Sequence, residues 1–207
     1  MTAARTRARR GEGERLRDEI LDVAEELLVS TGDENAVSIR AIAQRVGVTP
    51  PSIYLHFADK ESLLWAVCER QFAKFDAVLE AASATTDDPI EALRRRGEAY
   101  ARFGLEHPDA YRMMFMARPT VADRHAATID RSGGSAFTHH VEAVQRAIDT
   151  GALRPDLDAL QVAIFTWSGM HGITSLLISL ASFPWPDREQ LVRGMCALQL
   201  RALKAEP

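Results

Sequence analysis

The chain has 207 residues, of which 46% are hydrophobic and 26% charged, and its formal net charge is −4. This is the composition of an ordinary water-soluble globular protein, and it argues against a low-complexity chain. The two cysteines fall within helical apolar patterns, which argues against a disulfide framework and predicts a cytoplasmic protein. Ala, Leu, Glu and Arg are abundant and strand-like alternation is short, so the predicted fold is all-α.

The first residues form a positive segment in a chain that is negative overall. Residues 1–10 carry four arginines and no acidic residue, and no apolar segment of the kind found in a secretory signal follows them. We expect residues 1–13 to form a flexible basic arm, which either reaches a DNA minor groove or only increases solubility. The net charge itself weighs against a nucleic-acid binder, so any positive field has to be local.

Two helices are predicted before residue 48. Apolar residues recur at helical spacing from Leu16 to Leu28, and Gly32 is expected to end this first helix. Ser38 is placed to cap a second helix. Gly47 should end that helix after about two turns, because glycine readily adopts the left-handed conformation that a tight turn requires.

A third and a fourth helix are predicted from capping residues. Thr49 is expected to cap the third helix and Pro50 to occupy its first position, where a missing N–H group has no cost. This helix should end near Phe57. Asp59 is expected to cap a fourth helix that runs to about residue 82. Two short helices around a glycine-centred turn are typical of a helix-turn-helix.

Five short motifs follow one another within and just after this segment. They are Ile42-Ala43, Gly47-Val48-Thr49, Ile53-Tyr54, His56-Phe57 and Lys60-Glu61-Ser62-Leu63-Leu64. Over about residues 14–66 they resemble the DNA-binding domain of TetR-family repressors. The resemblance implies a helix-turn-helix at about residues 38–57, within a three-helix DNA-binding domain at residues 14–60. It also implies a homodimeric regulator of transcription that binds operator DNA.

A recognition helix presents its N-terminal residues to the bases of the major groove. From this geometry and from the resemblance, the residues expected to contact DNA are Ser38, Arg40, Thr49, Pro50, Pro51, Ser52, Tyr54, Leu55, His56 and Lys60. The hydroxyl groups of Thr49 and Ser52 can bond a phosphate or a base edge. Pro50 and Pro51 depart from the family, in which Lys or Gly is frequent here. We therefore expect weak direct readout and more reliance on DNA shape.

Further helices are predicted beyond the DNA-binding domain. They are expected at about residues 89–107, 108–118, from 120, 135–150, 157–182 and 187–203, with a hinge or loop at Gly133-Gly134. Asp88 and Glu91 have the spacing of a capping box. Asp156 is expected to cap the long helix that Pro184 would end. We assign residues 61–207 to a larger helical domain for ligand binding and dimerisation.

The stretch from Ala159 to Pro186 contains no Asp, Glu, Lys or Arg and is long enough to span a bilayer. Its polar residues, among them His171, favour a buried packing or dimer helix, and no membrane association is predicted. The motif Trp167-Ser-Gly-Met-His-Gly172 resembles one C-terminal subgroup of the TetR family. In that family the last two long helices pair with those of a second subunit, which implies a homodimer through residues 157–182 and 187–203.

Aromatic and methionine side chains concentrate in the C-terminal helices, Tyr111, Met113 and Phe115 among them, as in pockets for small apolar ligands. The residues expected to bind an effector are Phe72, Phe75, Tyr100, Phe103, Met114, Phe137, Trp167 and His171. Tyr100, His171 and Thr174 are candidates for the polar contacts. The alternative for each is simple packing in the core. The sequence thus predicts a repressor released by a small, largely apolar effector, and the alternative is a ligand-independent or architectural DNA-binding protein.

Histidines invite a metal interpretation at His139 and His140, near Glu142, with His125 and His171 elsewhere. Adjacent side chains on a helix point about 100° apart and make a poor ligand pair, so no metal and no cofactor is predicted. No phosphate-binding glycine loop, zinc spacing or nucleophile elbow occurs, so an enzyme is not predicted either.

Overall fold

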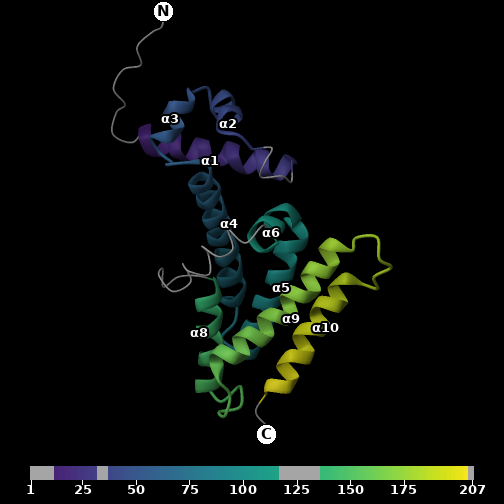
Figure 1. Cartoon of the computed structure of the whole chain (residues 1–207). Coiled ribbons are helices and arrows are strands. Elements are labelled where there is room, and N and C mark those ends of the chain that lie inside the picture. Colours follow the sequence, from purple (N-terminus) through teal and green to yellow (C-terminus); the bar gives the residue numbers. More distant parts are fainter. Residues whose placement is uncertain (1–11, 32–36, 117–135, 205–207) are drawn as a thin grey trace, which may run out of the picture. The chain divides into compact units, whose positions relative to one another are not determined.

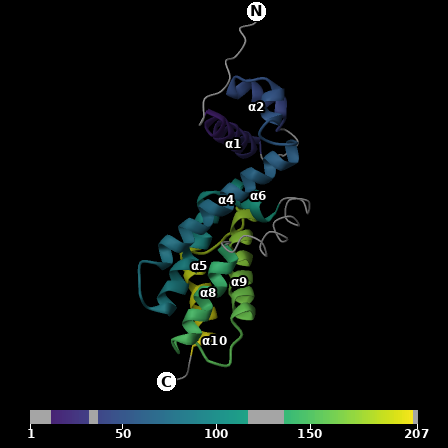
Figure 2. The same ribbon diagram turned by 90° about the vertical axis from the view of Figure 1, so that its left-hand side faces the viewer.

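The computed structural model describes residues 12–31, 37–116 and 136–204, which form helices and no strand (Figures 1 and 2). The helices are α1 (Glu12–Thr31), α2 (Ile39–Val46), α3 (Pro50–Tyr54), α4 (Lys60–Ser83), α5 (Pro89–Glu106), α6 (Pro108–Phe115), α8 (Ala136–Asp149), α9 (Ala159–Ser179) and α10 (Arg188–Leu203). The all-α prediction is confirmed. Some sequence predictions fall outside the described residues. They are the basic arm at residues 1–11, the end of the first helix at Gly32, the helix expected from residue 120, His125, and the hinge or loop at Gly133-Gly134.

The chain divides into two compact units, residues 1–70 and 71–207. The division falls inside α4, whereas the sequence placed the boundary before this helix, at residue 60. In the first unit, Arg70 on α4 bonds Glu25 at 2.6 Å and lies 2.7 Å from Asp22, and both acids are on α1. This guanidinium therefore fastens the beginning of α4 to the DNA-binding helices.

Helix α2 begins and ends at the residues that the sequence indicated, and α3 begins where it was expected. The Ser38 hydroxyl accepts a hydrogen bond from the Ala41 N–H at 3.1 Å, and Gly47 ends α2 in the left-handed conformation with φ of 78°. Thr49 occupies the N-cap position of α3 but makes no capping bond with its side chain. The helix ends at Tyr54, earlier than the predicted Phe57, and the His56 and Phe57 N–H groups after it both donate to the Ile53 carbonyl.

The core of the first unit holds these short helices in place. Its largest fully buried side chains come from α1, α2, α3, α4 and the segment before α2: Ile20, Ile42, Ile53, Leu63, Val37, Val67 and Cys68. Full burial of an aliphatic side chain of this size contributes about 1.5–3 kcal/mol relative to exposure. Helix α3 has too few residues to be stable alone, so Ile53 is its main anchor.

In the second unit, α5 packs against α6, α8, α9 and α10 (Figure 2). Asp88 caps α5 by accepting hydrogen bonds from the N–H groups of Ile90 and Glu91. The predicted capping box is only half formed. The Glu91 carboxylate bonds Arg94 and Arg95 instead of the cap, and these hydrogen bonds lower the pKa of Glu91 to about 2.

Helix α9 is shorter at both ends than predicted. Asp158, not Asp156, caps it, accepting a hydrogen bond from the Gln161 N–H at 2.8 Å. The helix ends at Ser179, before Pro184, because the Trp185 indole N–H donates to the Leu180 carbonyl at 2.9 Å and closes a turn there. By length and composition α9 is also apolar enough to cross a membrane, and 33% of its apolar window is buried within the chain.

Candidate nucleic-acid interface and regulatory cluster

The ten residues predicted to contact DNA lie on α2, on α3, in the segments beside them and, for Lys60, at the start of α4 in the first unit. Ile53 is fully buried, whereas its neighbours Tyr54 and Leu55 expose 52% and 85% of their surface. Thr49, Pro50, Pro51, Ser38 and Arg40 are exposed, and Ser52, His56 and Lys60 are half-buried. The short helix therefore uses one apolar side chain as an anchor and presents the remainder of its surface outward.

Two contacts shape this outward face. The hydroxyl oxygens of Thr49 and Ser52 lie 3.0 Å apart and share a hydrogen bond, so one of them retains a proton to donate to an external acceptor. The Arg17 guanidinium on α1 lies 5.1 Å from the centroid of the Phe57 ring. This cation–π contact fixes a positive charge beside the end of the helix-turn-helix. Sequence reasoning missed Arg17, because nothing local to α1 indicates a ring 40 residues further along.

The second unit contains a cluster of aromatic rings between α4, α5 and α6. The Phe75 ring lies 5.1 Å from Tyr100 and from Phe103, and 5.9 Å from Phe115, in edge-to-face arrangements. Phe72 meets Phe115 at 5.3 Å. Such pairs contribute about 0.5–1.5 kcal/mol each beyond their buried area, so the cluster is a strong packing element of this unit.

A chain of polar groups crosses this apolar cluster. The Trp167 indole N–H donates to the Tyr100 hydroxyl at 3.3 Å, and the hydroxyls of Tyr100 and Tyr111 lie 3.1 Å apart. The Tyr111 hydroxyl lies 2.7 Å from His171 Nδ1, the shortest contact among these polar groups, and His171 Nε2 lies 3.3 Å from the Ser175 hydroxyl. Tryptophan can only donate, which fixes the first bond; for the others we assign Tyr100 as donor to Tyr111 and Tyr111 as donor to His171 Nδ1, with the imidazole proton on Nε2.

Burial keeps this polar chain uncharged. Desolvation raises the pKa of both Tyr100 and Tyr111, and it lowers the pKa of His171. At neutral pH the phenols therefore retain their protons and the imidazole is neutral. The chain offers neutral donors and acceptors, and no full charge, to anything that enters the cluster.

The structure brings the predicted effector residues together. Phe72, Phe75, Tyr100, Phe103 and Met114 belong to one packed cluster, and hydrogen bonds join Trp167 and His171 to it. Phe137 contacts the Trp167 ring at 5.6 Å, and it packs against a second core around Val144. Thr174, a candidate for a polar contact, donates within α9 to the Met170 carbonyl at 2.7 Å.

Three residues that contact this cluster, Tyr111, Phe115 and Ser175, are not among the eight predicted to bind an effector, although composition had already drawn attention to Tyr111 and Phe115. Pro108, which begins α6, was the available signal for the first two, because it places Tyr111 and Phe115 on successive turns of the same helix. Ser175 lies one turn after His171 on α9 and meets its Nε2 atom. A hydroxyl at this spacing from a histidine is too common a pattern to be predictive.

Together, a helix-turn-helix with an exposed polar face and a larger helical unit with a buried aromatic cluster define a DNA-binding regulator of transcription. Residues 20–67 match the bacterial regulatory proteins of the tetR family, and residues 93–198 match the tetracyclin repressor-like C-terminal domain. The second match covers half of the chain. The chain therefore belongs to the TetR family, as its sequence motifs predicted.

Two curated relatives are similar to this chain over part of their length. The transcriptional activator FasR of Mycolicibacterium smegmatis is 33% identical over 99 residues, which are 48% of this chain and 45% of FasR. The transcriptional repressor KstR2 of Mycobacterium tuberculosis is 28% identical over 149 residues, 69% of this chain and 71% of KstR2. This chain thus matches less than half of FasR.

Solved structures share the fold over nearly the whole chain. A protein of unknown function from Rhodococcus sp. RHA1 superimposes with a TM-score of 0.76 at 23% identity, covering 99% of this chain and all of that one. The fatty acid degradation regulator FadR of Bacillus halodurans has a TM-score of 0.74 at 16% identity, over 94% of this chain and 97% of FadR. At these identities the likeness extends to the fold alone.

Proposed function

We propose that this protein is a cytoplasmic homodimeric repressor that a small, largely apolar effector releases from its operator. The observation that carries the DNA-binding part is the exposed surface of α3 and of Leu55 after it, held outward by the fully buried Ile53. A short helix end of this kind fits the major groove, where the hydroxyls of Thr49 and Ser52 can bond a phosphate or a base edge. Repression rather than activation is proposed because the match to KstR2 covers more of the chain than the match to FasR.

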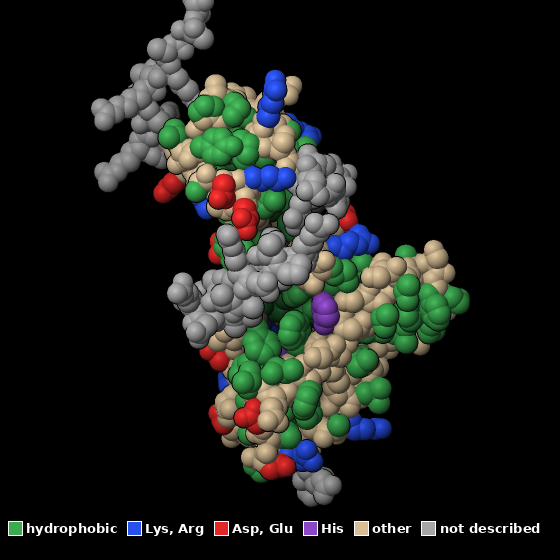
Figure 3. Space-filling view, viewed as in Figure 1, with side chains coloured by type: hydrophobic (Ala, Val, Ile, Leu, Met, Phe, Trp, Pro, Cys, Tyr) green, Lys and Arg blue, Asp and Glu red, His purple; other side chains and the backbone are tan. Residues whose placement is uncertain are grey.

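The proposed dimer uses α9 and α10. Several large hydrophobic side chains on and next to these helices are exposed in the single chain, namely Leu160, Ile164, Phe165, Trp167, Leu176, Leu180, Phe183 and Leu198. Figure 3 shows hydrophobic side chains gathered on the second unit, including the connection between α9 and α10. An apolar surface of this extent on a soluble protein is typical of a protein interface. A second copy that covers α9 also accounts for its uncharged sequence without a membrane.

Substitution of one exposed residue tests this interface. Phe165 on α9 exposes 65% of its surface, and Val78 on α4 exposes 37%. We expect Phe165→Glu to convert the dimer to a monomer in sedimentation experiments, because a carboxylate would be buried without a partner. The control Val78→Glu introduces the same charge away from α9 and α10 and should remain dimeric. If both variants sediment like the wild type, this interface is wrong.

The proposed effector site is the aromatic cluster with its polar chain. Pockets for small ligands combine apolar walls with a few oriented polar groups, as Phe75, Phe103 and Phe115 do around Tyr100 and His171. The neutral state of the polar chain favours an effector with an apolar body and an uncharged polar group. Binding would favour a dimer state whose recognition helices no longer match half-sites about 34 Å apart.

The experiment is a gel shift on the DNA that flanks the protein's own gene, at two salt concentrations. We expect a dimer to bind one sequence selectively. Tyr54→Ala should weaken binding at least tenfold because it removes a hydrogen bond to a DNA phosphate, and a hydrogen bond to a charged group is worth about 1.5–3 kcal/mol. Tyr54→Phe keeps the ring and isolates the contribution of the hydroxyl. Absence of DNA binding even at low salt would refute the proposal.

An effector screen on the same DNA separates the two candidate functions. A small apolar compound that dissociates the wild-type complex, but not that of Tyr111→Phe, supports a ligand-responsive repressor acting through the polar chain. Selective binding that no compound alters favours the ligand-independent DNA-binding protein. Binding without sequence preference favours the architectural protein.

A further inference from the structure

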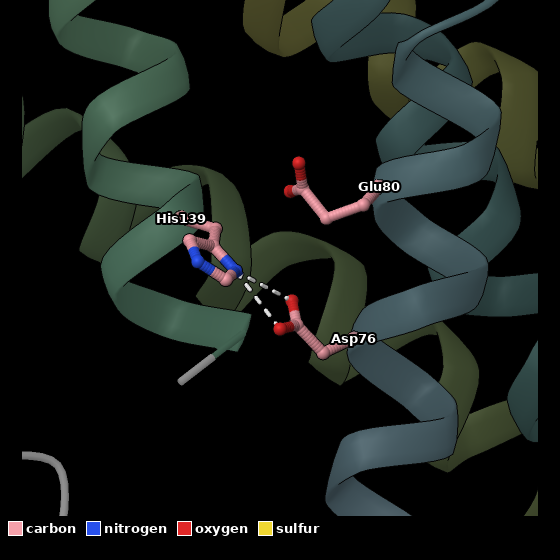
Figure 4. Close-up of side chains that lie close together, drawn as sticks. All are labelled: Asp76, Glu80 and His139. Carbon is pink, nitrogen blue, oxygen red and sulfur yellow. Dashed lines mark hydrogen bonds and ion pairs between the residues drawn. The ribbon is translucent and has the colours of Figure 1, made fainter. Parts of the chain in front are cut away.

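Outside the aromatic cluster, three side chains that are able to bind a metal ion meet between α4 and α8 (Figure 4). Asp76 and Glu80 lie one turn apart on α4, and His139 points toward them from the first turn of α8. One potential ligand atom from each residue lies within 4.8 Å of the other two. His139 Nδ1 is 3.0 and 2.8 Å from the two carboxylate oxygens of Asp76. The neighbouring His140 points elsewhere, to the Thr166 hydroxyl at 2.8 Å.

The charges in this cluster do not balance when the imidazole is neutral. Arg96 on α5 is buried, with 3% of its side chain exposed, and contacts Glu80 as well as the Ala136 carbonyl. It lies 3.7 Å from Asp76. Two carboxylates and one guanidinium leave one negative charge, and Asp76 exposes only 14% of its side chain. An excess negative charge at a partly buried site favours a cation beside it.

We propose that Asp76, Glu80 and His139 bind one divalent transition-metal ion of the zinc type. One imidazole nitrogen and two carboxylate oxygens are a ligand set that suits Zn²⁺ and its first-row neighbours. Three protein ligands leave a position for water. The ion and the proposed effector would bind at different sites, because the metal ligands lie outside the hydrogen-bonded polar groups of the aromatic cluster.

The geometry requires one small movement. Metal–ligand bonds of about 2.0–2.2 Å place neighbouring donor atoms about 3–3.5 Å apart. The Asp76 oxygens and His139 Nδ1 already have nearly this spacing, at 2.8–3.0 Å. Glu80 has to approach by about 1 Å, for which it has room because 43% of its side chain is exposed. Of the two Glu80 carboxylate oxygens, Arg96 bonds Oε1, so it can orient this carboxylate while Oε2 faces the ion.

Binding would replace the proton between His139 and Asp76 with a metal ion and thereby join α8 to α4. Because the ligands bind metal only in their deprotonated forms, the affinity should fall as the pH falls. The folded chain would also gain stability with rising metal concentration. Both effects are measurable on the protein alone, without DNA or effector, so the result does not depend on the proposed function.

The test is a calorimetric titration of tag-free, full-length protein with Zn²⁺, after treatment with a chelator. We expect one ion per chain and a rise in the unfolding temperature on binding. His139→Gln should lower the affinity at least tenfold. The matched control Glu142→Gln, at an exposed position one turn further along α8, should bind like the wild type. Co²⁺ as a spectroscopic probe should give visible absorption bands that His139→Gln weakens.

Two results would overturn the proposal. One is a wild-type protein that takes up no Zn²⁺ saturably at micromolar concentrations. The other is a folded His139→Gln variant, checked by circular dichroism, that binds Zn²⁺ as the wild type does. If His139→Gln does not fold, Glu80→Gln replaces it as the ligand variant, and undiminished binding by that variant equally refutes the site.

Discussion

Replacing Gly104 with alanine probes how closely α5 packs against α6 and α9. A Cβ atom at this position would lie 2.6 Å from Thr174 Cγ2 and 2.8 Å from Tyr111 Cδ2. The favourable separation of two carbon atoms is about 3.5–4.0 Å. Tyr111 and Thr174 are both fully buried, so neither side chain can turn into solvent to make room. The added methyl group therefore has to displace part of the core.

Two opposing energies set the size of the effect. Inserting one carbon into a well-packed core costs about 1–3 kcal/mol, and two contacts below 3 Å place this case near the upper value. Alanine in a helix gains about 1 kcal/mol over glycine. We therefore expect a net loss of about 2 kcal/mol, which lowers the unfolding temperature by about 4–8 °C in a chain of this size. Thermal unfolding followed by circular dichroism measures it.

A second substitution identifies the atom responsible. Thr174→Ser removes Cγ2, the atom closest to the new methyl group, and keeps the hydroxyl that donates to the Met170 carbonyl. In a double-mutant cycle with Gly104→Ala we expect a favourable coupling of about 1 kcal/mol. The reasoning is refuted if Gly104→Ala is as stable as the wild type, or if the cycle shows no coupling.

Three further predictions use the same kinds of measurement. Ser38→Ala should destabilise the first unit by about 1 kcal/mol in urea unfolding, because the Ala41 N–H loses its cap; an unchanged midpoint would contradict this. Gly172→Ala has no atom within 4 Å of its new Cβ in the single chain, yet it should weaken dimer association in sedimentation experiments if α9 faces a second copy; an unchanged dimer counts against that interface. Burial lowers the pKa of His140 to about 3, so between about pH 6.5 and 3 the unfolded chain binds a proton that the folded chain does not. His140 should therefore lower the free energy of unfolding by about 1.4 kcal/mol for each pH unit of acidification in this range. Chemical unfolding at several pH values measures it, and the same pH dependence in wild type and His140→Gln would exclude this contribution.

Helix boundaries were predictable where a cap acts within three residues. Ser38 and Asp88 each accept a hydrogen bond from the backbone of the helix that they begin, as predicted. The cap of α9 was misplaced because Asp156 and Asp158 both have the right chemistry. Only the folded turn before Ala159 selects the second of them.

Contacts between distant helices were not predictable from one sequence. Tyr100 and His171 are 71 residues apart, and Asp76 and His139 are 63 residues apart. Their side chains meet because α5 packs on α9 and α8 lies beside α4, which no local pattern specifies (Figures 2 and 4). Composition identified the aromatic rings that cluster, because many such residues have few other places to be buried. It carried no information on how polar groups would pair among them.

The hydrogen-bonded chain that begins at Trp167 has only one fixed end. The indole N–H donates to the Tyr100 hydroxyl, and the assigned directions continue through Tyr111 to the imidazole of His171. A molecule that accepted both the indole N–H and the Tyr100 hydroxyl proton would allow the series of protons to invert. His171 would then carry its proton on Nδ1 and accept from Ser175. The tautomer of a single imidazole, readable from its nitrogen chemical shifts, would thus report an event at the opposite end of the cluster.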